Sequence, residues 1–222
     1  MGDPDEKRAR SLRADAVRNR ECILTTAREL FARRGISVTL NDLAHEAGVG
    51  VGTVYRHFPD KDAVILALVS QKFDTLFTLV QRAGEEPDPR EAVRGYLRGI
   101  FELRAQDSAL DAAIARARMA APGIEQRARE LDSKVRNVLR RAHDARVVRP
   151  GLAETDIPVF ITMLGSVIDA TRDVHPGLWR RYAELLIDAV CPPDGAHAII
   201  GCPLTQHPPP HVAAHDLVRP RT

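Results

Sequence analysis

The sequence is poor in cysteine, with three in 222 residues. Cys22, Cys191 and Cys202 lie far apart, and no C-x-x-C pair occurs. A disulfide framework needs grouped cysteines in an even number, and a zinc finger needs closely spaced paired ligands. Neither class is indicated, and we expect Cys22 to be a small core residue of the first helix.

Long hydrophobic runs are also lacking. The longest, such as the segment from Pro158 to Ile168, fall far short of the roughly twenty residues that cross a bilayer. The amino terminus is charged where a secretory signal would need an apolar stretch. We therefore expect a cytoplasmic protein with no membrane association.

Catalytic and cofactor motifs are missing as well. The chain contains no H-E-x-x-H, no P-loop, no dinucleotide glycine pattern and no Ser-His-Asp order. His207, His211 and His215 have the spacing of a metal-binding helix face, but the prolines between them forbid the helix. We expect no enzymatic activity, no cofactor and no metal site.

The net charge of +2 does not by itself indicate a nucleic-acid binder. The charge is unevenly placed, however, because the stretch from Lys7 to Lys61 holds 11 Lys or Arg against 6 Asp or Glu. Such a local excess is the electrostatic footprint expected of a surface that binds an anionic partner.

Helical periodicity recurs along the chain and no strand pattern is convincing, so we predict an all-α fold. Residues 1–15 are expected to form a mobile arm, 16–62 a small domain and 63–192 a larger helical domain. The proline-rich segment 193–222 is expected to be disordered. The predicted helices cover about 16–34, 40–47, 51–58, 60–83, 89–106, 108–120, 122–147, 155–173 and 177–190.

The segment from Thr39 to Lys61 has the pattern of a helix-turn-helix. Thr39 and Asp42 have the spacing of a capping box that starts one short helix, and Gly48 suits its left-handed end. In the next short helix Val54 and Phe58 share one face, which leaves a polar side free. Two short helices of this kind suit the DNA major groove.

The run from Ala47 to Val64, Ala-Gly-Val-Gly-Val-Gly-Thr-Val-Tyr-Arg-His-Phe-Pro-Asp-Lys-Asp-Ala-Val, closely resembles the signature of the tetracycline-repressor (TetR) family of bacterial transcription regulators. The resemblance covers about residues 17 to 66. It implies a three-helix DNA-binding domain joined by a long fourth helix to a helical domain that dimerises and often holds a small effector. The expected function is that of a repressor that binds a palindromic operator on double-stranded DNA as a homodimer. The repressor would leave the operator when a small-molecule effector binds.

Residues that match the signature take the family's DNA-contacting roles. Tyr55 and His57 are expected to donate hydrogen bonds to phosphates, and Lys61 would do so from the start of the fourth helix. Thr53 and Arg56 are the candidates for base edges, with Arg56 suited to guanine.

Four further positions complete the expected DNA contact set. Thr39 adds a contact from the preceding helix, and Gly52 allows a close approach of the backbone. Gly50 stands where the family often has Ser or Thr, and Val51 stands where a polar reader is common. Val51 either meets a thymine methyl or packs.

The larger domain is expected to hold the effector among apolar helices, although such a stripe is also typical of plain core. The predicted pocket residues are Leu97, Ile100, Phe101, Ile114, Met119 and Met163.

The last two helices carry apolar stripes that one monomer cannot fully cover, so we expect them to form a symmetric four-helix bundle between two copies. The predicted interface residues are Ile157, Phe160, Ile161, Leu164, Ile168, Tyr182, Leu185 and Leu186.

Three alternatives stay open at this point. The chain could regulate DNA without an effector, or it could be a helical protein-interaction module that no longer binds DNA. A small helical enzyme is the third, and it has no visible catalytic constellation in its favour.

Overall fold

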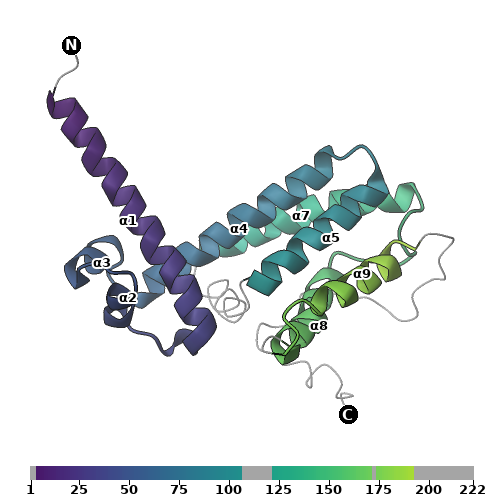
Figure 1. Ribbon diagram of the computed structural model, residues 1–222. Helices are drawn as coiled ribbons and strands as arrows, with labels where there is room; N and C mark the ends of the chain where they lie inside the picture. Colours follow the sequence, from purple (N-terminus) through teal and green to yellow (C-terminus); the bar gives the residue numbers. More distant parts are fainter. Residues whose placement is uncertain (1–3, 107–121, 172–173, 193–222) are drawn as a thin grey trace. The chain divides into compact units, whose positions relative to one another are not determined.

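The computed structural model describes residues 4–106, 122–171 and 174–192, and within these ranges it contains helices and no strand (Figure 1). The predicted all-α fold is therefore confirmed. The helices are α1 (Pro4–Arg34), the 3-10 turn η1 (Gly35–Ser37), α2 (Leu40–Glu46), α3 (Val51–His57), α4 (Lys61–Glu85), α5 (Pro89–Gln106), α7 (Pro122–Asp144), α8 (Asp156–Thr171) and α9 (Trp179–Val190).

The chain divides into two compact units, which we call the head and the body. The head holds the described residues up to Gln71, and the body holds those from Lys72 onwards. The head extends beyond the expected boundary at residue 62 because Val64 and Leu68, in the first turns of α4, are fully buried in its core.

The head core forms where α1, α2, α3 and the start of α4 meet. Because apolar residues recur every three or four positions in α1, one side of that helix is buried. The expected inward residues of α1 are confirmed, since each of them is at most 2% exposed: Ile23, Ala27, Leu30 and Phe31.

Helix α1 begins at Pro4, twelve residues before the expected start at Ala16. Proline is favoured in the first turn of a helix, and it is the start signal that the sequence offers here. The segment was expected to be a mobile arm because of its charged and small residues.

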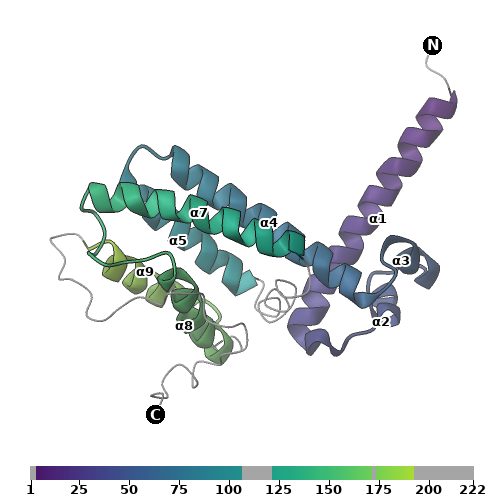
Figure 2. The same cartoon turned by 180° about the vertical axis from the view of Figure 1, so that it is seen from behind.

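In the body, α5 packs on α7, α8 and α9, and the two views show the second half of α4 running alongside α5 and α7 (Figures 1 and 2). Most bounds lie within two residues of the predicted ones, and α7 ends three residues early at Asp144. The predicted helix at 108–120 and the tail at 193–222 lie outside the described residues.

Helix α4 is long and apolar enough to cross a membrane by length and composition. It is the one helix of the described chain that passes this test. Its apolar residues, however, include Val64 and Leu68 of the head core, and it carries Lys72 in the middle.

Candidate nucleic-acid interface

Helix α2 begins with the predicted capping box. The Asp42 amide donates to Thr39 Oγ1 at 3.1 Å, and the Thr39 amide donates to Asp42 Oδ2 at 2.9 Å. The Thr39 hydroxyl also donates to Asp42 Oδ2 at 2.6 Å. These hydrogen bonds from Thr39 hold the pKa of the Asp42 carboxyl below its usual value. The hydroxyl proton of Thr39 is therefore already used within the head, and a phosphate at Thr39 would have to compete for it.

The turn between α2 and α3 is tight because Gly48 has a φ of +64°. The Val49 amide can then donate to the Ala44 carbonyl at 3.1 Å, which closes the end of α2. Gly50 precedes α3 and offers no side-chain cap, so the Thr53 amide bonds to the Gly50 carbonyl at 2.8 Å instead. The helix start is held by backbone bonds alone.

Helix α3 presents the face predicted from its sequence. Val54 and Phe58 are at most 1% exposed and anchor the helix, which confirms the expected inward pair. On the other side Tyr55 is 50% exposed and Arg56 is exposed, and neither side chain makes a hydrogen bond or ion pair with any other described residue. Donors held on a rigid helix without an internal partner are available to phosphates and base edges.

The remaining residues of α3 frame this face. Thr53 and His57 are half-buried, and Val51 is 45% exposed, so Val51 does not pack into the head core. A Cβ added at Gly52 would meet no atom within 4 Å. Packing within the head thus does not require glycine there, and the open space suits a close approach by a partner.

Lys61 is the first residue of α4. The Ala63 amide donates to Asp60 Oδ1 at 2.8 Å, which confirms Asp60 as the predicted cap of this helix. Lys61 is half-buried and stands close in sequence to the α3 face.

Two arginines of α1 hold the helix-turn-helix in place, and sequence reasoning missed both. The Arg20 guanidinium carbon lies 4.4 Å from the centroid of the Phe58 ring, a cation–π contact at the end of α3. Arg33 forms an ion pair with Glu46 at the end of α2, which lowers the pKa of the Glu46 carboxyl. Sequence alone gives no signal for pairs so far apart in the chain.

The expectation that Cys22 is a core residue is wrong. Its side chain is exposed, with Sγ 3.9 Å from the Ala47 carbonyl oxygen. Because Ile23, Leu24 and Ala27 define the buried side of α1, Cys22 falls just outside it.

The predicted pocket residues are only partly brought together. Leu97, Ile100 and Phe101 lie on the buried side of α5, each at most 2% exposed. Met163 is 51% exposed on α8 and does not join them. Ile114 and Met119 lie outside the described residues.

The predicted dimer stripes need a correction on α8. Ile157, Leu164 and Ile168 are at most 4% exposed within a single chain, so they are not available to a partner. Phe160 and Ile161 are half-buried. The predicted stripe is thus divided: Ile157, Leu164 and Ile168 pack inside the chain, where α8 contacts α5 and α9, and Phe160 and Ile161 are only half-buried.

Apolar side chains also lie on the neighbouring side of α8 and on α9. We call them the outer face: Met163, Tyr182 and Leu185, which are exposed, and Val159, Val167 and Leu186, which are half-buried. Met163 is 51% exposed, Leu185 is 54% and Tyr182 is 42%. The α9 part of the predicted interface thus remains exposed, with Leu186 half-buried.

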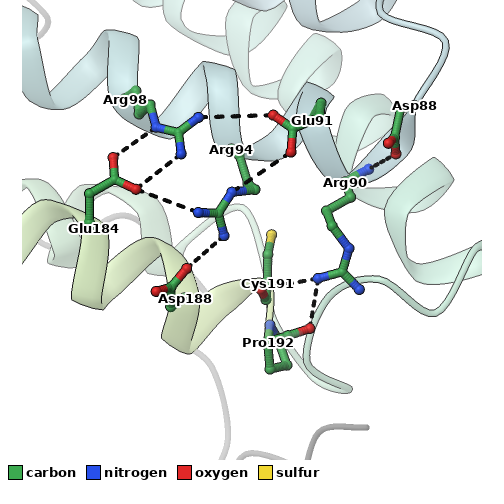
Figure 3. A network of polar contacts seen from close by, with 9 residues as sticks. All are labelled: Asp88, Arg90, Glu91, Arg94, Arg98, Glu184, Asp188, Cys191 and Pro192. Carbon is green, nitrogen blue, oxygen red and sulfur yellow. Dashed lines mark hydrogen bonds and ion pairs between the residues drawn. The ribbon is translucent and has the colours of Figure 1, made fainter. Parts of the chain in front are cut away.

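Ion pairs connect α9 to α5 (Figure 3). Arg98 binds both carboxylate oxygens of Glu184, at 2.8 and 3.0 Å, and Arg94 reaches Asp188 at 2.7 Å. Hydrogen bonding from Arg98 lowers the pKa of Glu184. Arg90 donates to the carbonyls of Cys191 and Pro192 at 3.2 and 2.6 Å, which caps the end of α9. Burial raises the pKa of Cys191 to about 11.

Comparisons with known proteins agree with this geometry. The sequence pattern of bacterial regulatory proteins of the tetR family matches residues 23–68, which spans α2, α3 and the start of α4. The HTH-type transcriptional regulator SAR0097 of Staphylococcus aureus (strain MRSA252) is 40% identical over 78 residues, 34% of this chain and 41% of that protein. The chain thus matches about two fifths of the length of that curated relative.

Solved structures extend the likeness to the body. The TetR transcription regulatory protein from Mycobacterium vanbaalenii is 30% identical, with 81% of this chain and 99% of that chain covered and a TM-score of 0.55. FadR from Bacillus subtilis in complex with stearoyl-CoA shares the fold at 20% identity and a TM-score of 0.55, with 77% of this chain and 98% of that chain covered. The signature around α3, its exposed polar face and the near-complete coverage of a relative at this identity lead to one conclusion: the chain belongs to the TetR family of DNA-binding transcriptional regulators.

Proposed function

We propose that this protein is a cytoplasmic repressor that binds a palindromic operator as a homodimer and leaves it when a small molecule binds the body. The observation that carries the proposal is the free face of α3, where the side chains of Tyr55 and Arg56 have no partner among the described residues. A helix fixed from behind by Val54 and Phe58 can hold these donors in one geometry.

Each polar residue on and beside α3 has a proposed role in DNA binding. Tyr55, His57 and Lys61 hold phosphates and set the register of the protein on the duplex. Thr53 and Arg56 read base edges, Arg56 by two parallel bonds to guanine.

The positions without polar side chains contribute shape. Gly50 and Gly52 let the backbone approach, and the exposed Val51 meets a thymine methyl. Thr39 contacts a phosphate by donating its hydroxyl proton to a phosphate oxygen in place of Asp42 Oδ2.

The dimer follows from the outer face of α8 and α9. Two copies related by a two-fold axis would bury Met163, Tyr182 and Leu185 in a four-helix bundle. The same axis relates two α3 helices, which calls for half-sites about 34–36 Å apart or a multiple of that spacing.

An effector is supported by the apolar interior of the body and by a neighbour of the same fold. Leu97, Ile100 and Phe101 offer apolar volume on α5, and FadR from Bacillus subtilis is known in complex with stearoyl-CoA. A ligand shifts an operator-bound population only by its preference between two conformations of the protein. The body must therefore have two arrangements that differ in α4.

The test is selection from a random-sequence duplex library, followed by binding of the selected duplex in a salt titration. We expect an inverted repeat to be enriched, and a log–log salt slope that reports several phosphate contacts per dimer. Failure to enrich any sequence, with binding equal for the selected and a scrambled duplex, would contradict the proposal.

A protein-interaction module is the second candidate, favoured by the uncapped Gly50 and the exposed apolar Val51 at the start of α3. The same selection separates the two, because an interaction module would enrich no duplex.

A further inference from the structure

Helix α4 belongs to both units of the chain. Its first turns contribute Val64 and Leu68 to the head core, and Gln71 contacts α1 by accepting from Arg28 at 3.3 Å and donating to Glu21 at 3.2 Å. From Lys72 to Glu85 the same helix belongs to the body. The contacts that hold this second half therefore decide what the body can transmit to the head.

Arg127 of α7 makes a three-part contact with α4. Its guanidinium carbon lies 5.4 Å from the centroid of the Phe77 ring and 5.7 Å from that of Phe73, and it forms an ion pair with Asp74. Phe73, Asp74 and Phe77 occupy neighbouring positions on a single turn of α4. The Arg127 side chain is 28% exposed and Phe73 is buried, so the contact with the rings is largely shielded, whereas Asp74 is 69% exposed and solvent screens the ion pair.

Arg141, fourteen residues later on α7, holds the other end of the same stretch. It donates to the carbonyls of Gly84 at 2.8 Å and Glu86 at 2.7 Å, and to that of Ala83 at 3.5 Å. The last carbonyls of a helix have no partner within the helix, and a cation there also interacts favourably with the negative end of the helix dipole. At about 1.5 Å per residue the contacted residues Asp74 and Gly84 lie roughly 15 Å apart along α4.

The contact of α4 with α5 at Gly99 has a different character. A Cβ added at Gly99 would lie 2.4 Å from Leu79 Cδ2, so the Leu79 side chain sits directly on the α5 backbone. This contact is apolar and non-directional, and helices in such contacts can slide over small distances. The arginine contacts with α7 require particular geometries.

We propose that the second half of α4 and α7 form one rigid pair, with Arg127 as the positioning residue through which the body sets the direction of α4 toward the DNA-binding head. This inference rests on the proposed function. An effector then changes operator binding by moving the second half of α4 and α7 together. Arg141 contacts the carboxyl-terminal end of α4, and Arg127 contacts the turn of α4 that follows the head residues.

The test compares Arg127→Gln with Arg129→Gln in the full-length protein. Arg129 lies on the same helix, is 69% exposed and pairs with Glu125 of α7 itself at 3.8 Å, so it controls for loss of one arginine. The exposed Cys22 in the head takes a nitroxide label once Cys202 is replaced by serine, while Cys191 is buried. Pulsed EPR then reports the distance between the two heads of a dimer.

We expect Arg127→Gln to broaden the distance distribution between the two Cys22 labels and to weaken binding of the selected duplex by about threefold to tenfold, the size usual for residues of a coupling element. Arg129→Gln should leave both unchanged. Arg127→Lys, which keeps a cation beside Asp74 and the rings, should restore most of the narrow distribution. A residue that merely stabilised the body would lower the unfolding temperature without broadening the distances at low temperature.

Hydrogen exchange of residues 72–86 gives a second reading that does not need the dimer. Faster exchange there in Arg127→Gln, and not in Arg129→Gln, supports the pair. A labelled dimer with the parent's distances, together with unchanged exchange, would overturn the inference. Parent protein that shows no dipolar coupling and sediments as a monomer would instead refute the proposed dimer, and exchange would still decide on the pair.

Discussion

Substituting Leu185 by glutamate should strongly weaken the dimer without unfolding the chain. Leu185 is 54% exposed in the single chain, so a partner can still bury about half of its side chain. Full burial of leucine contributes about 1.5–3 kcal/mol, which leaves roughly 1–1.5 kcal/mol per copy and roughly 2–3 kcal/mol for a symmetric pair. Burying the new carboxylates adds a further cost.

The dimer dissociation constant should therefore rise by roughly 100-fold or more, since each tenfold change corresponds to about 1.4 kcal/mol. Sedimentation velocity over a concentration series measures this shift, and circular dichroism checks the fold. Met163→Glu, also on the outer face, should act in the same way.

Two control variants separate a loss of the dimer interface from a general effect of the added charge. Leu66→Glu adds the same charge at a 42% exposed leucine of the head and should leave the dimer intact. Leu164→Glu puts the charge at a residue that is 1% exposed and should unfold the chain. If Leu185→Glu and Met163→Glu both dimerise like the parent, the outer face is not the interface and the reasoning is wrong.

Three further predictions concern the DNA surface, pH and thiol chemistry. Lys61→Ala should lower the salt slope of operator binding by about one unit for every sequence, whereas Arg56→Ala should also relax base preference by about 1–3 kcal/mol at one position, both measured by fluorescence anisotropy. Arg98 lowers the pKa of Glu184, so the folding stability that this ion pair contributes is present above the unfolded-state pKa of about 4.3 and is lost as the pH falls through the folded-state pKa. Glu184→Gln should flatten this part of the acid unfolding curve. In native protein a maleimide should label Cys22 quickly and Cys191 only on unfolding, because Cys191 is buried with a pKa of about 11.

Sequence reasoning predicted the head well because its signals are local. The capping box of Thr39 and Asp42, the left-handed Gly48 and the inward pair Val54 and Phe58 each depend on residues within a few positions of one another. Local hydrogen bonds and helical periodicity are enough to specify such features.

The body was harder because its decisive contacts are long-range. Arg98 and Glu184 are 86 residues apart, and Arg127 and Asp74 are 53 apart. On α8, periodicity placed Leu164 in the interface stripe, although packing against helices distant in sequence buries it. Charge pairs between distant helices leave no periodic signal.

Hydrogen exchange of the full-length protein with and without the selected duplex tests most directly that the free face of α3 binds DNA. Slower exchange on adding the duplex should centre on residues 50–61, and a scrambled duplex at the same salt should give less protection. Protection confined to other segments, with residues 50–61 unchanged at saturating duplex, would contradict the assignment of this surface.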